Sequence, residues 1–305
     1  MSRIYYIFLI LLLVITVLFE TIGVIHLDLQ IYICGIFISL LGIPHGAIDH
    51  IIYRQDKNIS STVFYSFYLG LMVLYCILWV YFPAISMTVF VLISAFHFGQ
   101  SQFSKLLFNE KSKIVVLQIT WGLSILSGLV IYNFNQISVL ASSNSDTMAL
   151  LGAFNYTVYL SVLIISTFIA VSLLCNLLTN NSITLQYFIK ETAILGLIHL
   201  CFFHLPILVG FTLYFCTLHS MQVLTEEFEY LKKRMHQMSA YKFLKLLTPF
   251  TLLSLIGSGI LLFLSQSEIL NISSTLLLFI LISILTLPHS IVMDNFYFKS
   301  SKLQP

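Results

Sequence analysis

The chain has 305 residues, of which 59% are hydrophobic and only 9% are charged, and its net charge is +2. Soluble domains carry about 25% charged residues, so this composition excludes a water-soluble globule, and the small net charge gives no support for binding nucleic acid. The long apolar runs predict an all-α integral membrane protein, because the strands of a membrane barrel alternate between polar and apolar side chains. We expect residues 1–305 to form a single polytopic membrane domain.

Ten segments are apolar enough to cross a bilayer, which takes about 17–25 residues per helix. The first segment follows Arg3, and no small-residue cleavage site is evident after it, so we expect it to be retained as a span. The ten segments are 4–25, 30–53, 62–82, 84–105, 114–134, 153–178, 188–205, 207–231, 243–264 and 271–294. An eight-span arrangement, in which 188–205 and 207–231 are rearranged, is the main alternative.

Basic residues distinguish the two sides of this ten-span arrangement. All 14 lysines and arginines fall at the N-terminus or in the connections on one side, from Arg3 to Lys302. The connections on the other side contain none; they lie around Asp28, Pro83, Asn135, Pro206 and Glu268. Because lysine and arginine are enriched in cytoplasmic loops, the sequence predicts that both termini face the cytoplasm.

Four histidines lie at similar depths in four of these segments, and they are His45, His97, His219 and His289. The first basic residue after each is Arg54, Lys105, Lys232 and Lys299, which is 9, 8, 13 and 10 residues further on. These spacings correspond to about 12–20 Å along a helix. Four imidazole rings at one level could surround a common centre, and neutral imidazole is a common metal ligand.

The densest cluster of polar residues is the segment Pro44–His50, with the sequence PHGAIDH. His45 and Asp49 are four residues apart and therefore share a helix face. Asp49 is a candidate for orienting His45 or a neighbouring ligand, as carboxylates often do for metal-bound imidazole. The alternative is a polar helix end, where Asp49 and His50 meet lipid headgroups near Arg54. Ionisable groups inside a membrane are costly, which favours the functional interpretation.

The other three histidines have different surroundings. Small and polar residues flank His97, so its face is expected to point into the bundle. Taken alone, His97 would be interpreted as a core histidine, and its shared depth with the others favours a ligand instead. His219 lies in the middle of its span, where an unpaired polar group costs most. His289 follows Pro288, and a ligand, a support for a ligand and an interfacial histidine all remain open for it.

The histidine-rich set limits the choice of metal. Imidazole nitrogens suit iron, copper, zinc and nickel. The five cysteines are interpreted as small core residues, and the absence of thiolates from the cluster argues against a structural zinc or an iron–sulfur site. An all-nitrogen site deep in an apolar setting suits non-haem iron(II) and dioxygen acting on a lipophilic substrate, since dioxygen and such a substrate both partition into the bilayer.

At these residues the sequence resembles the Brp/Blh family of integral membrane beta-carotene 15,15'-dioxygenases. The matching motifs are Pro44–His50, His97–Gly99, Pro206–Phe215 leading to His219–Ser220, and Leu287–His289. They extend from the second span to the last, so the resemblance covers most of the chain. The first motif is specific, whereas the His-Phe-Gly and Pro-His fragments are weak when taken alone.

The resemblance implies an Fe(II) enzyme of the cell membrane, with a bacterial inner membrane as its location, that splits the central double bond of beta-carotene with dioxygen to give retinal. The iron ligands that it implies are His45, His97 and His219. The family pattern has a further histidine four residues after the last of these, where this chain has Val223. His289 or His50 would then complete the site, or three histidines would hold the iron.

Three other functions remain open. The substitution at Val223 is also compatible with a diverged enzyme that cleaves another lipophilic polyene. Ionisable residues near the middle of the membrane are also used by transporters, so a non-enzymatic transporter or metal-binding protein is the alternative from another functional class. Paired histidines at one level could also bind haem.

Overall fold

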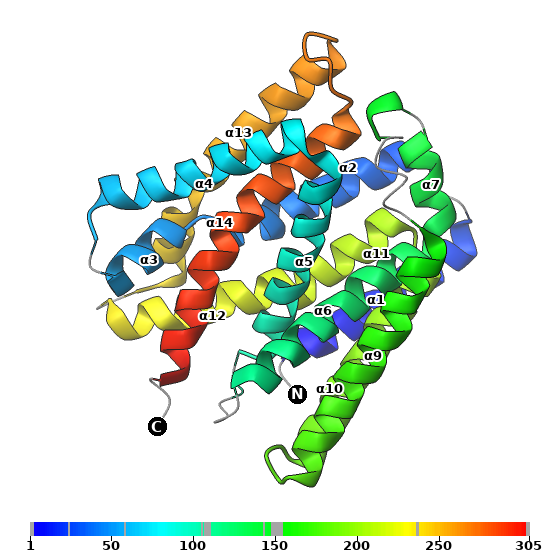
Figure 1. The fold of residues 1–305 in the computed structure, drawn as a ribbon, viewed down its shortest axis with the longest axis vertical. Helices are drawn as coiled ribbons and strands as arrows, with labels where there is room; N and C mark the ends of the chain where they lie inside the picture. Colours follow the sequence, from blue (N-terminus) through cyan, green and yellow to red (C-terminus); the bar gives the residue numbers. More distant parts are fainter. Residues whose placement is uncertain are drawn as a thin grey trace.

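The computed structural model describes residues 3–23, 25–57, 59–104, 106, 111–142, 144–147, 155–235 and 238–302. Within these ranges the chain forms helices and no β-strand, so the predicted all-α class is confirmed. The elements are α1 (Arg3–Ile22), α2 (Leu27–Phe37), η1 (Ile38–Gly42), η2 (Ile43–Gly46), α3 (Asp49–Lys57), α4 (Ser61–Tyr81), α5 (Pro83–Gln102), α6 (Lys111–Tyr132), α7 (Phe134–Ser142), α9 (Tyr156–Thr179), α10 (Leu185–His204), α11 (Ile207–Leu213), η3 (Tyr214–Ser220), α12 (Met221–Arg234), α13 (Ala240–Gln266) and α14 (Ser274–Lys302). Figure 1 shows them packed as one bundle, with α5 near the centre of the view, α4 and α13 on one flank and α9 and α10 on the other.

Ten helical stretches among the described residues are long and apolar enough to cross a membrane. Each overlaps one of the ten spans predicted from the sequence, and the edges agree to within a few residues. The stretches Leu185–His204 and Ile207–Arg234 are separate and each qualifies by itself, contrary to the eight-span alternative. The placement of both termini in the cytoplasm stays a prediction, and Lys105, the basic residue expected after His97, lies outside the described residues.

Side-chain caps fix the start of several helices. A side-chain oxygen accepts a hydrogen bond from the backbone N–H three residues further on at Ser60, Asn155, Thr184 and Ser239. These caps satisfy N–H groups that have no partner within the helix. They determine where α4, α9, α10 and α13 begin, and they explain why these boundaries follow serine, threonine or asparagine in the sequence.

Two of the ten stretches depart from regular α-helix, and both departures contain a histidine of the four. In the second stretch, α2 continues into the π-helical η1 and then the 3₁₀ segment η2, which contains Pro44 and His45. In the eighth stretch, α11 continues into the π-helical η3, which contains His219. Pro44 lacks a backbone N–H and cannot continue an α-helical ladder. Short π-helical segments occur often at functional sites, and here they set the direction of two of the rings.

Helices α5 and α6 approach each other unusually closely, and glycine makes this possible. A Cβ atom added at Gly99 would lie 1.9 Å from the backbone oxygen of Gln118, and one added at Gly122 would lie 1.8 Å from that of Ala95. The two glycines therefore let backbone pack directly on backbone. His97 lies between Ala95 and Gly99, so this contact fixes the depth and rotation of its helix.

A compact apolar cluster surrounds the ends of α3, α12 and α14. We call it the α12–α14 cluster; among its buried members are Ile48, Ile52, Val223, Tyr230, Leu231, Met293 and Phe296. Tyr230 and Phe296 join the two helices directly, with ring centroids 5.0 Å apart. This cluster holds the three elements together on one side of the four histidines.

Candidate metal centre

The four histidines that were selected from the sequence meet in the interior of the bundle. His45 on η2, His97 on α5, His219 on η3 and His289 on α14 are each between 2% and 9% exposed. Ring centroids of neighbouring pairs lie 4.8 to 6.5 Å apart. One ligand atom from each of His45, His97 and His289 lies within 4.8 Å of the other two, so these three residues could hold a metal ion. The ring of His219 is 4.8 Å from that of His97 and 5.3 Å from that of His45.

Three of the rings use their Nδ1 atom for a hydrogen bond to the protein. His45 Nδ1 contacts the backbone oxygen of Gly42, and His289 Nδ1 lies 2.9 and 3.0 Å from the two carboxylate oxygens of Asp49. His219 Nδ1 lies 3.0 Å from Ser101 Oγ. A carbonyl and a carboxylate only accept hydrogen bonds, so the protons of His45 and His289 are on Nδ1 and their Nε2 atoms carry a lone pair.

The tautomer of His219 follows from a second hydrogen bond of Ser101. The Ser101 hydroxyl donates to the backbone oxygen of Phe98 at 2.9 Å. A hydroxyl has one proton to donate, so towards His219 it acts as the acceptor, and His219 Nδ1 is the donor. The Nε2 atom of His219 therefore also carries a lone pair.

Four of the remaining ring nitrogens of the cluster are buried without a hydrogen bond. Within the described part of the chain, Nε2 of His219, Nε2 of His289 and both nitrogens of His97 have no partner. Leaving buried polar atoms unpaired costs about 1–3 kcal/mol each. An imidazole that donates through one nitrogen and offers a lone pair on the other is the usual arrangement of a metal-bound histidine. The residues therefore fit a metal ion held by neutral imidazole.

The Asp49 carboxylate holds the ring of His289 in place through its Nδ1 atom. Asp49 is 3% exposed, and its carboxylate also accepts a hydrogen bond of 3.0 Å from the Tyr68 hydroxyl on α4. The sequence left open whether Asp49 would orient His45 or a neighbouring ligand, and the contact is with His289, 240 residues further along the chain. A carboxylate in this position fixes the ring and makes its free nitrogen a stronger donor to a metal.

His50 and Val223 pack among aromatic and apolar side chains. The ring of His50 packs on Phe250, with centroids 4.4 Å apart, and near Tyr65. Val223 is fully buried in the α12–α14 cluster. Of the candidates named for the additional ligand, the structure thus brings His289 to the other three rings and leaves His50 among aromatic side chains.

Small residues allow the four rings to come together. A Cβ atom at Gly46 would lie 3.3 Å from Nδ1 of His289, and one at Gly42 would lie 2.8 Å from the ring of Phe215. Gly42 therefore lets η3 approach η1, and Gly46 leaves room for His289 of α14. Without these approaches the rings on η2, η3 and α14 would be held further apart.

Aromatic side chains pack directly against the histidines. The Phe215 ring stacks on His219 at 5.6 Å and meets the edge of His45 at 5.5 Å, and Phe98 meets His219 at 4.8 Å. Phe211 stacks on Phe215 at 5.3 Å and extends the row by one helical turn. Composition alone could not show where the many phenylalanines lie; these contacts show that some of them line the histidine cluster.

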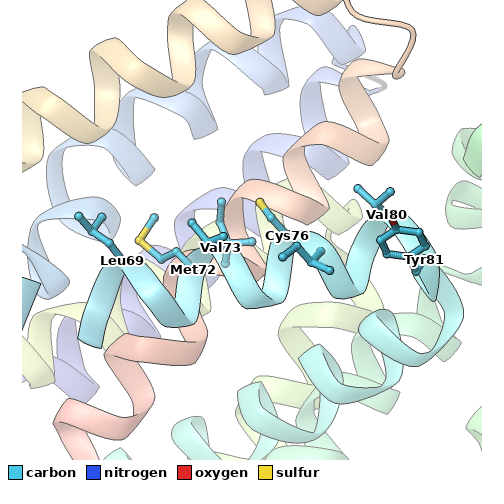
Figure 2. Close-up of a pocket in the computed structure, with 8 residues that line it drawn as sticks. Leu69, Met72, Val73, Cys76, Val80 and Tyr81 are labelled. Carbon is cyan, nitrogen blue, oxygen red and sulfur yellow. The ribbon is translucent and has the colours of Figure 1, made fainter. Parts of the chain in front are cut away.

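A separate apolar groove lies on the outward face of α4 (Figure 2). Its volume is about 490 Å³, and its lining includes Leu69, Met72, Val73, Cys76 and Ile284. Leu69 and Val73 are more than half exposed, as is expected for side chains that face lipid. None of the four histidines lines this groove, so it is distinct from the candidate metal centre.

Comparison with known proteins places these observations in a family. The family model described as beta-carotene 15,15'-dioxygenase matches residues 36–297. A protein of an uncultured marine bacterium (66A03), named beta-carotene 15,15'-dioxygenase, is 28% identical over 270 residues, which cover 84% of this chain and 90% of that protein. No solved structure matches the chain. The matched region contains all four histidines and Asp49, and the chain belongs to the beta-carotene 15,15'-dioxygenase family of carotenoid-cleaving membrane enzymes.

Proposed function

We propose that this protein binds iron(II) at its four buried histidines and uses dioxygen to split the central double bond of beta-carotene, giving two molecules of retinal. The observation that carries the iron proposal is the set of buried ring nitrogens without a hydrogen bond on His97, His219 and His289. The substrate and the position of cleavage follow the description of the family.

His45, His97, His219 and His289 would hold the metal, and Asp49 would hold the ring of His289 in place. All four ligands are neutral nitrogen donors, a set that suits iron. Because they carry no negative charge, they do not neutralise the positive charge of the ion. When bound, iron(II) would supply the activation of dioxygen that the organic side chains cannot provide. The protein itself fixes the rings, keeps bulk water away from them and presents an apolar surface beside them.

The aromatic row Phe98, Phe211 and Phe215 provides that surface. A polyene is a flat, rigid and apolar molecule, and aromatic rings pack well against such a molecule without needing polar contacts. We infer that the polyene packs against this row, with its central double bond close to the metal. The substrate would come from the bilayer, where it is most soluble.

The main test is expression of the chain in bacteria that accumulate beta-carotene, with retinal measured by chromatography. We expect retinal from the wild type and none from His97→Ala, because His97 has no other role for its two ring nitrogens. His50→Ala is the matched control, since this histidine packs on Phe250 outside the cluster and should retain activity. A cleavage product of another length would instead indicate a different polyene or position, which is the alternative left open by Val223.

The ten spans make this a multi-pass membrane protein. We propose that it lies in a bacterial inner membrane with both termini in the cytoplasm, on the basis of the one-sided distribution of basic residues. A fluorescent protein fused after Pro305 should then fold and fluoresce, whereas an alkaline phosphatase fused at the same point should be inactive. The reverse pair of results would contradict the orientation.

A further inference from the structure

A layer of polar side chains lies between the four histidines and the basic end of the bundle. In each histidine-bearing span, at least one such residue follows the histidine and precedes the first basic residue. We call them the polar layer: Asp49, Gln100, Gln222, Glu226, Glu227 and Asp294. In the stretch that carries His219, Phe211 and Phe215 precede the histidine and the polar residues follow it.

Hydrogen bonds connect the polar layer across three helices. Gln100 Nε2 donates to Asp294 Oδ1 at 2.7 Å, which links α5 to α14. Gln222 Nε2 donates to the backbone oxygen of Ser101 at 2.8 Å, and Ser104 donates to Glu226 at 3.1 Å, which links α12 to α5. Asp294 is exposed and Gln100 is only 4% exposed. The layer therefore extends from the surface of the protein into its interior.

Glu227 is the most unusual member of this layer. Its side chain is fully buried, and neither carboxylate oxygen has a hydrogen-bond partner among the residues that the structure describes. Val223 and Leu231, one turn away on either side, belong to the apolar α12–α14 cluster, and the carboxylates of Asp49 and Glu226 repel a negative charge on Glu227. Burying such a group without a partner is costly, and this cost indicates that Glu227 has a function.

Two further buried oxygens without partners belong to residues that are closer in sequence to the histidines than Glu227 is. Ser220, the last residue of η3, is seven residues, or about two helical turns, before Glu227, so the two residues lie on the same face of the continuous helix that η3 and α12 form. Ser220 Oγ is fully buried and has no partner within the described ranges, and the same holds for Oε1 of the buried Gln100. Ser220 adjoins His219, while Glu227 is eight residues, or about 12 Å, from His219 along the helix.

The oxygens of Glu227, Ser220 and Gln100 could each be satisfied by a hydrogen-bond donor or by a cation. Oxygen ligands suit a hydrated divalent cation, and carboxylates that approach each other attract one. A stable ion at Glu227 is not indicated, since the only group of three or more close metal-ligating side chains found in the described residues is that of the histidines. A cation would therefore pass Glu227 rather than stay there.

We propose that Glu227 and the polar layer form the route by which iron(II) reaches the four histidines from the basic end of the bundle, with Glu227 as a transient ligand on the way. This inference rests on the proposed metal centre. The metal and the substrate would then enter by different paths. Iron(II) would pass along the polar layer, and the polyene would enter along the aromatic row. Glu227 then acts on the rate of metal loading and takes no part in the final coordination.

The experiment measures loading of the full-length protein after its metal has been removed with a chelator in detergent micelles. Iron(II) is added without oxygen, and the rate of uptake and the final iron content are measured. Cobalt(II), whose visible spectrum changes when imidazole replaces water, gives the same rate optically. For Glu227→Gln we expect uptake at least about tenfold slower than the wild type, with the same final metal content and the same final cobalt spectrum.

Two further variants separate this role from a structural one. Glu227→Met places an apolar side chain of similar length in the α12–α14 cluster, so we expect a higher unfolding temperature together with slow loading. Glu191→Gln is the matched control: Glu191 is also fully buried, but it is paired with Lys190 and Gln102 and lies outside the polar layer. It should load at the wild-type rate.

Each outcome bears on one of the two proposals. Equal loading rates for the wild type and both Glu227 variants, with full occupancy, would overturn the route and leave the metal centre intact. A lower final metal content in Glu227→Gln would also overturn it, because Glu227 would then be a ligand of the bound ion. A wild-type protein that takes up no iron or cobalt at its histidines would contradict the metal centre itself.

Discussion

At the scale of single residues, the histidine cluster depends on the groups that hold each ring. Gly42, Ser101 and Asp49 each accept a hydrogen bond from one Nδ1 atom, and they come from two spans, the second and the fourth. Together they fix which nitrogen of His45, His219 and His289 is free to bind a metal. The identity of the acceptor sets the strength of the effect, because a carboxylate raises the basicity of the ring more than a hydroxyl or a carbonyl does.

Replacing Asp49 by asparagine should weaken metal binding while leaving the bundle folded. The amide retains the shape but removes the charge that orients His289, and losing such a partner typically costs about 10–100-fold in metal affinity. Competition with a chromophoric chelator would measure the affinity. His50→Ala, one residue away and outside the cluster, should bind metal as the wild type does. An unchanged affinity in Asp49→Asn would show that His289 is not a ligand.

Replacing Ser101 by alanine should have a smaller effect of the same kind. The variant loses the acceptor for His219 Nδ1, so the ring can adopt the tautomer whose Nε2 carries the proton and cannot bind a metal. A neutral hydrogen bond contributes about 0.5–1.5 kcal/mol, which corresponds to a loss of roughly 3- to 10-fold in metal affinity. Ser127→Ala, in which a serine on α6 loses only bonds to its own helix, is the control.

At the scale of the elements, the position of His97 depends on the contact between α5 and α6. Gly99 and Gly122 each meet the backbone of the opposite helix at a distance that no larger residue can have. Because a transmembrane helix gains little from apolar burial against its neighbours in lipid, close backbone packing contributes much of the association. These glycines thus determine both stability and the geometry of the site.

Gly99→Ala should therefore destabilise the protein by about 1–3 kcal/mol or more, since the added methyl group overlaps the Gln118 backbone and forces the helices apart. It should also lower the iron content, because His97 moves with α5. Gly70→Ala is the matched control: it lies in α4, where an added Cβ meets nothing within 4 Å. Thermal unfolding in detergent and elemental analysis of iron would measure the two effects. A variant as stable as Gly70→Ala would disprove the role given to this contact.

The helices and the site were predictable from the sequence only in part. Composition and the one-sided basic residues predicted the ten spans and the common depth of His45, His97, His219 and His289. The π-helical and 3₁₀ segments around His45 and His219 had no periodic signal, because an apolar run looks alike in any helix type. The pairing of Asp49 with His289 joins positions 240 residues apart, and only packing decides between such partners. Ser101 and Tyr68 were missed for the same reason, since a hydroxyl near a histidine in space has no spacing rule in sequence.

At the scale of the whole molecule, the four ring-bearing spans are dispersed over most of the chain. His45 lies on the second stretch and His289 on the last, so a bound metal would cross-link spans that are otherwise held by apolar packing and by few polar contacts. Any ligand that binds only the folded state stabilises it by an amount that grows with the logarithm of its concentration relative to its dissociation constant. Metal loading should therefore change the stability of the entire bundle.

Removing the metal should lower the unfolding temperature of the protein, and adding iron(II) without oxygen should restore it. At a free metal concentration of 100 times the dissociation constant, the expected stabilisation is about 2.7 kcal/mol. The variant His97→Ala should lose most of this metal-dependent shift, because its ring faces His219 and His289 across the cluster. His199→Ala is a suitable control, as its ring is held by Ser124 between other helices. A shift of equal size in His97→Ala and His199→Ala would place the metal elsewhere in the bundle, since only one of these rings belongs to the four that converge.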